Sequence, residues 1–386
     1  MRALRTVAMV AATAIITVAA AAPVSAAHRP AAPGRPVSVE PLPDDLRLSG
    51  AGAAWRLRYT STSWSGRTTV VSGTLAVPPG RPPRHGWPVV SFAPGFGGTP
   101  DACAPSVAGV PPFARPFGEA LLAAGYAVAV TDYEGIGTPG ESSVVHGPAE
   151  AYAVIDIVRA ARRLAPVSRA WAAVGYSLGG HAALWAGHLA TGYAPELRHN
   201  GTVAIAATTQ WAAQFAAPPA RDPAAPLNPV VPFMGRTLAL THPGQFRAGD
   251  WFTPAGMELV DLAGRVCVAE MAAAIAGVTN GDALRDPAAA ADAFTALLAP
   301  HEVPIGRYRE PVRLAHGTAD ALPAVLSEIT AGLLAAAGTD VEYAPVPGAD
   351  HFTVLALVAR ATVAWLAEMF ASVPGWKHED AAAEPR

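Results

Sequence analysis

The sequence predicts an α/β fold in which a mostly parallel central sheet has helices on both faces and a helical cap is inserted late in the chain. Short, continuously apolar runs alternate with helix-length segments, as expected for strands buried on both faces and joined by crossover helices. The alternation is interrupted once, over residues 211–310, which is too long for a simple connection. Because 51% of the 386 residues are apolar and 15% are charged, the chain can bury a large core.

The charge balance indicates which partners the chain does not take. It has 27 Lys+Arg against 30 Asp+Glu, a net charge of −3, so neither a nucleic acid nor an anionic membrane is an expected partner. Neither cysteine has a second cysteine or a spaced histidine pair nearby, so we expect no metal. No cofactor is implied either.

The first 27 residues predict a signal peptide. Arg2 and Arg5 precede an uncharged run over residues 6–22, and small residues follow at positions 24–27. A retained membrane anchor is the alternative, but the run is short and rich in alanine. We expect the rest of the chain to be secreted, with no further membrane span.

The first part of the core is expected over residues 28–210. It begins with a Pro/Ala-rich extended leader over residues 28–43. Antiparallel strands follow at residues 55–59 and 68–77, where small or polar residues alternate with β-branched ones. The αβ alternation then predicts strands at residues 88–93, 127–130, 170–174 and 203–207, and helices at residues 113–124, 151–164 and 178–191.

The inserted cap, residues 211–310, is rich in alanine and has helical patterns at residues 266–277 and 288–298. Large apolar residues in it indicate that part of the cap faces inward over the predicted nucleophile: Trp211, Phe215, Phe233, Met234, Trp251 and Phe252. The second part of the core, residues 311–375, follows, and residues 376–386 form a polar tail. Its predicted elements are strands at residues 311–315 and 341–344 and helices at residues 323–337 and 353–371.

The strongest chemical signal is the run Gly175-Tyr176-Ser177-Leu178-Gly179, between a predicted strand and a predicted helix. A serine at such a sharp turn has a strained backbone, and a glycine two positions away on each side leaves room for it. The turn raises the hydroxyl above the sheet, where the helix N-terminus favours negative charge. We therefore predict that Ser177 is a nucleophile; the alternative is an ordinary helix-capping serine.

A serine nucleophile needs a general base, and the base needs an acidic group that orients it. His351 and Asp320 fit these roles, because each follows a predicted strand at the same edge of the sheet as Ser177. Other residues near strand ends or turns remain alternatives: the histidines His301 and His316, and the acids Asp132 and Asp350.

The reaction that such a serine performs also needs an oxyanion hole, formed by two N–H donors. Leu178, the residue after the nucleophile, is expected to supply one donor. The other is expected from the loop over residues 93–98, where Phe96 is the first choice and Gly97 the second.

The two cysteines, Cys103 and Cys267, are an even number in a chain predicted to be exported to an oxidising compartment. We therefore expect a disulfide between them. It would link the region after the oxyanion loop to the cap.

Several of these segments resemble the secretory lipases of the α/β-hydrolase superfamily, which occur in fungi and actinobacteria. The similarity covers nearly the whole chain after the signal peptide. It implies an α/β-hydrolase fold and a triad esterase with a helical lid between the strands that carry the serine and the aspartate. The segments are SGTLAVP at residues 72–78, CAPS at 103–106, GYAV at 125–128, TDYEGIG at 131–137 and GYSLGGHAALWA at 175–186.

The expected function is therefore that of a secreted carboxylic-ester hydrolase, a lipase or esterase that forms an acyl-enzyme on Ser177 and acts on an ester or lipid. An aminopeptidase or an acyltransferase with the same triad is the alternative. An aminopeptidase would need a carboxylate pair in the cap, for which Glu258, Asp261 and Glu270 are the candidates. A non-catalytic binding module is a third class. Acyl chain length, natural substrate and oligomeric state are left open.

Overall fold

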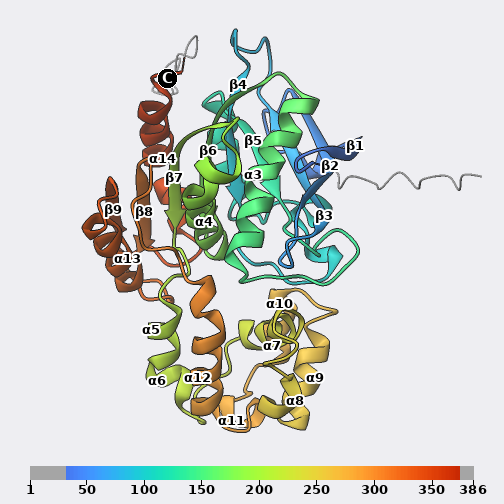
Figure 1. Ribbon diagram of the computed structural model, residues 1–386, viewed down its shortest axis with the longest axis vertical. Coiled ribbons are helices and arrows are strands. Elements are labelled where there is room, and N and C mark those ends of the chain that lie inside the picture. Colours follow the sequence, from blue (N-terminus) through green and yellow to red (C-terminus); the bar gives the residue numbers. More distant parts are fainter. Residues whose placement is uncertain (1–31, 374–386) are drawn as a thin grey trace, which may run out of the picture. The chain divides into compact units, whose positions relative to one another are not determined.

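A nine-stranded mixed β-sheet forms the centre of the protein, seen in a computed structural model that describes residues 32–373 (Figure 1). The strand order is β1-β2-β3-β5-β4-β6-β7-β8-β9. The pairs β1–β2, β2–β3 and β3–β5 are antiparallel, and the remaining pairs are parallel. The strands are β1 Pro36–Pro41, β2 Ala53–Thr62, β3 Thr68–Val77, β4 Trp87–Ala93, β5 Ala127–Thr131, β6 Val167–Tyr176, β7 Arg198–Ile205, β8 Val312–Gly317 and β9 Val341–Val346.

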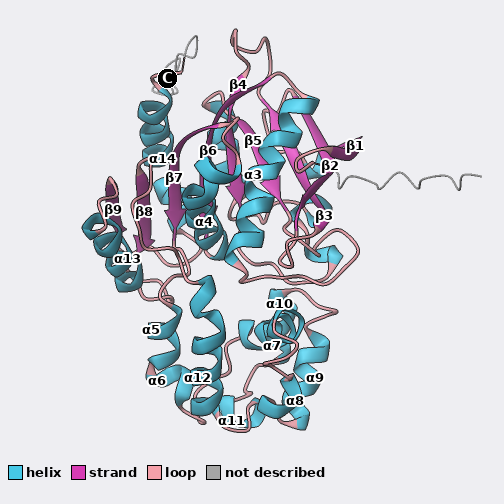
Figure 2. Cartoon of the chain, viewed as in Figure 1, coloured by secondary structure: helices cyan, strands magenta, loops and turns pink. Residues whose placement is uncertain are grey.

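Helices cover both faces of this sheet (Figure 2). Helices α3 (Gly147–Leu164) and α4 (Leu178–Tyr193) pack on one face against alternate residues of β6 such as Trp171 and Ala173. On the other face, α2 (Arg115–Ala123) and α14 (Val354–Phe370) belong to the cluster that contains the intervening residues of β6. Strands with two buried faces explain the continuously apolar runs of the sequence. The predicted α/β fold with a mostly parallel sheet is confirmed.

The chain between β7 and β8 is helical, and we call its helices α5 to α12 the cap helices. They gather beyond the ends of β7 and β8 in Figure 1. Two apolar clusters hold them, and these clusters also include Leu178 and Phe96 of the core. The cap helices are α5 Trp211–Ala216, α6 Pro218–Arg221, α7 Val230–Thr241, α8 Ala248–Trp251, α9 Pro254–Leu262, α10 Val268–Ala274, α11 Asn280–Ala283 and α12 Pro287–Leu298.

The remaining elements connect these parts. Helix α13 (Ala324–Ala336) packs beside β8 and β9. The short elements are η1 Asp44–Leu46, η2 Asp101–Cys103, α1 Pro105–Ala108 and η3 Ala299–His301. No helix among residues 32–373 is long and apolar enough to cross a membrane. The predicted signal peptide, residues 1–27, and the predicted polar tail, residues 376–386, lie outside the described residues.

Two sequence-based expectations are wrong in part. The predicted leader contains the edge strand β1, whose residues Val37 and Val39 are 57% and 38% exposed, so no buried face marks it in the sequence. Strand β7 begins at Arg198, well before the predicted start at residue 203. Polar residues such as His199 and Thr202 are buried in this strand and hide its apolar pattern.

Candidate active site

Ser177 lies in the turn between β6 and α4 and has a strained backbone. Its φ of 57° and ψ of −123° lie in a region that residues with a side chain rarely adopt. The turn is held by neighbouring backbone groups: the Ser177 N–H donates to Ile205 O at 2.9 Å, and the Gly180 N–H donates to Ser177 O at 2.9 Å. The side chain of Ser177 is thereby fixed at the carboxyl edge of the sheet.

The glycines on either side of Ser177 are required by close backbone packing. A Cβ added at Gly175 would lie 1.8 Å from Gly179 O, and one added at Gly179 would lie 1.9 Å from Ala93 O. Both distances are far below van der Waals contact, so no larger residue fits at either position without movement of the backbone. The glycine pattern of the sequence therefore has a steric cause.

Three strand ends bring the predicted serine, histidine and acid together. His351 follows β9, and its Nε2 lies 3.0 Å from Ser177 Oγ. Its Nδ1 lies 2.7 Å from Oδ2 of Asp320, which follows β8. The Tyr176 hydroxyl also donates to His351 O at 2.8 Å, so the residue before the serine helps to hold the histidine loop. In this geometry the hydroxyl donates to Nε2, and Nδ1 donates to the carboxylate.

A second histidine contacts Asp320. His316 Nε2 lies 3.2 Å from Asp320 Oδ2 and 3.0 Å from Leu322 O, so this nitrogen faces two acceptors and carries the proton. His316 Nδ1 then accepts from the Ser327 hydroxyl at 2.7 Å. His316 was a candidate base, but the structure places it behind the acid instead of beside Ser177. The short separation in His316-Gly317-Thr318-Ala319-Asp320 is the sequence signal for this contact.

The carboxyl group of Asp320 is fully buried, yet its charged form is favoured over its protonated form. Burial by itself raises its pKa, but hydrogen bonds from His316 and His351 outweigh burial and hold the pKa well below its usual range. The Leu322 N–H adds a further bond, 2.8 Å from Asp320 Oδ1. Asp320 can therefore stabilise a positive charge on His351.

The alternative residues do not contact the His351 side chain. Asp132 is buried elsewhere, where it accepts from Ser72 Oγ at 2.6 Å and from the Ser106 N–H at 2.9 Å, and burial raises its pKa to about 6. Asp350 caps the turn into α14 through bonds from Thr353. His301 lies at the end of the cap helices, where its carbonyl oxygen accepts from His181 Nε2 at 2.7 Å.

His181, on the helix after Ser177, has a role that the sequence did not reveal. It is fully buried, and its Nδ1 lies 2.9 Å from Glu150 Oε2. Burial disfavours a charged ring, but Glu150 raises the pKa of His181 overall. Through its bond to His301 O, this pair ties α3 and α4 to the segment where the chain leaves the cap helices.

The predicted oxyanion donors lie close to Ser177. Leu178 is the first residue of α4, and a Cβ added at Gly95 would be 3.4 Å from Ser177 Cβ, so the loop after β4 lies against the serine. Within residues 32–373 the N–H groups of Leu178, Phe96 and Gly97 have no hydrogen-bond acceptor. All three therefore remain candidate donors, and the choice between Phe96 and Gly97 stays open.

The predicted disulfide between Cys103 and Cys267 is present, with an S–S distance of 2.05 Å. Neighbouring contacts reinforce it: Gly98 forms an isolated β-bridge with Cys267, and Thr99 Oγ1 donates to Ala263 O at 2.7 Å. The chain that follows the oxyanion loop is therefore joined to the cap helices both covalently and by hydrogen bonds. Among the described residues, no group of three or more His, Cys, Asp or Glu side chains could hold a metal ion.

The order of the strands, together with the strained serine turn at the carboxyl end of β6, defines an α/β-hydrolase. Within that class, residues 117–217 match the model of the secretory lipase family. The resemblance indicated by the sequence is thereby confirmed.

Known proteins are similar to this chain in sequence or in fold. Lipase A of Moesziomyces aphidis is 29% identical over 199 residues; the match covers 46% of this chain and 41% of that protein, so less than half of the relative is spanned. The solved structure of Candida antarctica lipase A in its closed state has a TM-score of 0.74 at 20% identity, covering 88% of this chain and 83% of its own. The rice cell wall degrading esterase LipA of Xanthomonas oryzae has a TM-score of 0.72 at 17% identity, covering 88% and 98%. These structures show that the fold is shared.

Proposed function

We propose that this protein is a secreted serine carboxylic-ester hydrolase, a lipase or esterase. The observation that carries the proposal is the position of His351, whose two ring nitrogens lie within hydrogen-bond distance of Ser177 Oγ and Asp320 Oδ2. The match to the secretory lipase model supports an ester as the substrate. The acid, base and nucleophile predicted from the sequence are thus in a geometry that can form an acyl-enzyme.

In the first half of the proposed reaction, Ser177 Oγ attacks the ester carbonyl carbon while its proton moves to His351 Nε2. The carbonyl oxygen becomes an oxyanion, which the N–H groups of Leu178 and of Phe96 or Gly97 stabilise. The imidazolium then gives its proton to the alcohol oxygen as the C–O bond breaks. The products are a free alcohol and an acyl group on Ser177.

In the second half, water replaces the alcohol. His351 accepts a proton from water as its oxygen attacks the acyl carbon, and a second oxyanion forms. When this intermediate collapses, Ser177 Oγ leaves and recovers its proton from His351, which releases the carboxylic acid. Asp320 keeps its charge throughout and fixes which nitrogen of His351 carries the proton.

The cap helices give no support to an aminopeptidase. Glu258 and Asp261 are exposed on α9, and Glu270 is also exposed and accepts from the Cys267 N–H at 2.8 Å as part of a helix cap. None of them forms a carboxylate pair at the serine. An acyltransferase would share the first half of the reaction and differ only in the acceptor, so analysis of the products separates it from a hydrolase.

Secretion is part of the proposal. The disulfide supports it, because such bonds persist in oxidising compartments, and so does the description of the matching family. Expression of the full chain should release a protein that begins near residue 28, which N-terminal sequencing of the culture medium would detect.

The test is a panel of p-nitrophenyl esters, from acetate to palmitate, measured beside aminoacyl anilides. Turnover of the esters with release of free acid is expected, together with labelling of Ser177 by a fluorophosphonate. Ser177→Ala should abolish both, while the exposed Ser49→Ala should change neither. Turnover of the anilides without the esters would contradict the proposal.

A further inference from the structure

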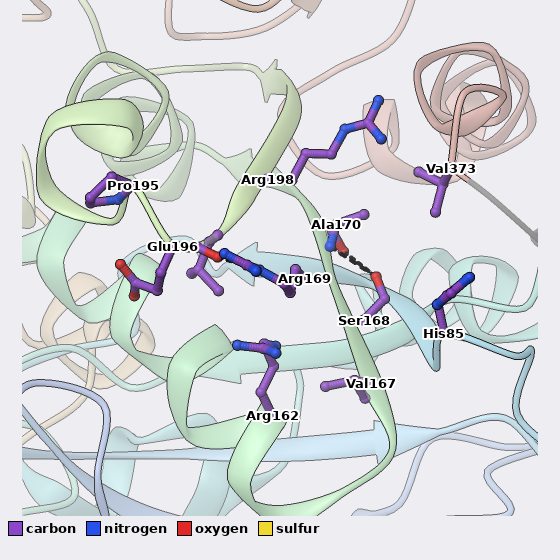
Figure 3. Close-up of a pocket in the computed structure, with 11 residues that line it drawn as sticks. His85, Arg162, Val167, Ser168, Arg169, Ala170, Pro195, Glu196, Arg198 and Val373 are labelled. Atoms are coloured by element: carbon purple, nitrogen blue, oxygen red, sulfur yellow. Dashed lines mark hydrogen bonds between the residues drawn. The ribbon is translucent and has the colours of Figure 1, made fainter.

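Positively charged side chains line a hollow at the amino end of strand β6, the end opposite to Ser177 (Figure 3). It has a volume of about 600 Å³ and lies at the amino ends of β6 and β7. Ser177 follows the carboxyl end of β6, and nine steps of about 3.3 Å separate it from Ser168, a distance of about 30 Å. The hollow is therefore separate from the candidate active site.

Three guanidinium groups line this hollow: those of Arg162, Arg169 and Arg198. Within residues 32–373 none of them forms an ion pair. Arg169 Nε donates to Glu196 O at 2.5 Å, and an Arg198 nitrogen donates to Ser372 Oγ at 2.7 Å. These partners are neutral; the nearby charge of Glu196 offsets part of the charge of Arg162 and Arg169, and Arg198 has no carboxylate partner among the described residues.

Glu196 is the carboxylate in the lining, and it shares the guanidinium of Arg159 with Asp156, which lies 2.7 Å from Arg159. Glu196 Oε1 lies 2.6 Å from Nε of Arg159, whose hydrogen bond holds the pKa of Glu196 below its usual range. The charges of Arg162 and Arg169 repel each other: burial lowers the pKa of Arg162 and the charge of Arg169 lowers it further, while Glu196 offsets part of this effect. A bound anion would relieve this repulsion.

A second hollow of about 230 Å³ adjoins the first and shares Arg198 with it. Its other arginine, Arg309, is paired at 3.8 Å with Glu310, which also lines it, so Arg198 carries the unpaired charge there among the described residues. The full chain has a net charge of −3, so this concentration of arginine does not follow from a basic composition. It is a local feature of the amino edge of the sheet.

We propose that this hollow binds a small anion that carries two or more negative charges, such as a polyphosphate or a polycarboxylate. Guanidinium groups hold phosphate and carboxylate oxygens through paired N–H donors. Arg162 and Arg169 face one part of the hollow with Glu196, and Arg198 extends from the adjacent strand (Figure 3). Cations on both strands match an anion with more than one charged group.

The test measures binding of inorganic tripolyphosphate to the full chain by titration calorimetry at low ionic strength. Saturable binding is expected, and added salt should weaken it. In the variant Arg162→Ala/Arg169→Ala the dissociation constant should rise at least about tenfold, because charge-assisted hydrogen bonds are lost. The control Arg58→Ala/Arg67→Ala removes two exposed arginines at the β2–β3 hairpin and should bind normally.

Three results would overturn the proposal: no saturable binding, equal weakening in both double variants, or binding of heparin but not of tripolyphosphate. Ester turnover at the distant Ser177 should be unchanged in both variants and reports that they fold. If the first variant does not fold, Arg198→Ala replaces it. The melting temperature of the unaltered protein should also rise with tripolyphosphate, and no rise would count against the site.

Discussion

At the scale of single residues, the candidate site depends on the chain that runs from Ser177 through His351 to Asp320. Asp320→Asn should lower ester turnover by about 10⁴-fold with the fold intact, because the amide no longer fixes the proton on His351 Nδ1. His351→Ala should have a similar effect, because the three residues act as a unit. Turnover and circular dichroism of the purified variants check this. Near-normal turnover of Asp320→Asn would show that the acid is wrongly assigned.

His316 adds a prediction of its own, as a positioning residue behind Asp320. Removal of its Nε2–H in His316→Ala should lower kcat roughly tenfold and leave KM unchanged, because one charge-assisted hydrogen bond orients the acid. His316→Gln keeps an N–H donor and should recover part of the loss. Steady-state kinetics of both variants provide the test. A purely structural role would instead lower the amount of folded enzyme in both without a change in kcat.

At the scale of elements, the disulfide joins the chain after the oxyanion loop to helix α10 across 164 positions. In the chain-entropy model a closure of this length stabilises the folded state by about 4–5 kcal/mol, less any strain. The free energy of unfolding of Cys103→Ser/Cys267→Ser should therefore be lower by about this amount. Urea unfolding of the variant and of the natural sequence measures the difference. Thiol titration of the denatured, unreduced protein gives a second check, since two reactive thiols would mean that the bond does not form.

The cap helices lead to a prediction about acyl chains. Side chains of the cap, such as Phe215 and Met234, pack in one cluster with Leu178, directly beside the serine. Burial of an acyl chain there contributes about 0.8 kcal/mol per methylene, so each two added carbons should raise kcat/KM by roughly tenfold until the space is filled. Medium-chain p-nitrophenyl esters should therefore outperform the acetate. A higher kcat/KM for acetate than for butyrate, hexanoate and octanoate would refute this role of the cap.

At the scale of the whole molecule, buried histidines make stability depend on pH. Burial lowers the pKa of His199 to about 4 and, as the main cause, that of His301 to about 3. The unfolded chain takes up these protons near pH 6.5, so below that pH the unfolded state binds more protons than the folded one. As the pH falls towards the folded pKa, each site lowers the free energy of unfolding by about 1.4 kcal/mol per pH unit.

A variant without these two rings isolates the effect. His199→Gln/His301→Gln should lose less stability than the natural sequence between about pH 7 and pH 5 in urea unfolding. Burial raises the pKa of Asp132 to about 6, so this residue makes the folded state more stable as the pH falls. The effect is the same in both proteins and cancels in the comparison. Equal losses in the two proteins would show that neither histidine is held neutral by burial.

Much of this architecture could be predicted from the sequence. Buried parallel strands appear in it as apolar runs, and the carboxyl ends of such strands meet at one edge of the sheet. That rule alone places Ser177, Asp320 and His351 near one another. The edge strand β1 and the start of β7 could not be predicted, since hydrogen bonding and buried polar residues determine them. The contact between His316 and Asp320 is indicated in the sequence only by their short separation, because the path of the tight loop that brings the two side chains together is not specified by residue patterns.

The bond between Cys103 and Cys267 also limits how the cap helices can move. If the cap helices were joined to the core only where the chain enters and leaves them, they could rotate as one body about the line between those two points. The disulfide is a third attachment, and the bridge from Gly98 to Cys267 stiffens it. With three anchor points the cap cannot turn as one body about the line between its chain ends, and reduction of the disulfide would leave only non-covalent contacts at the third anchor.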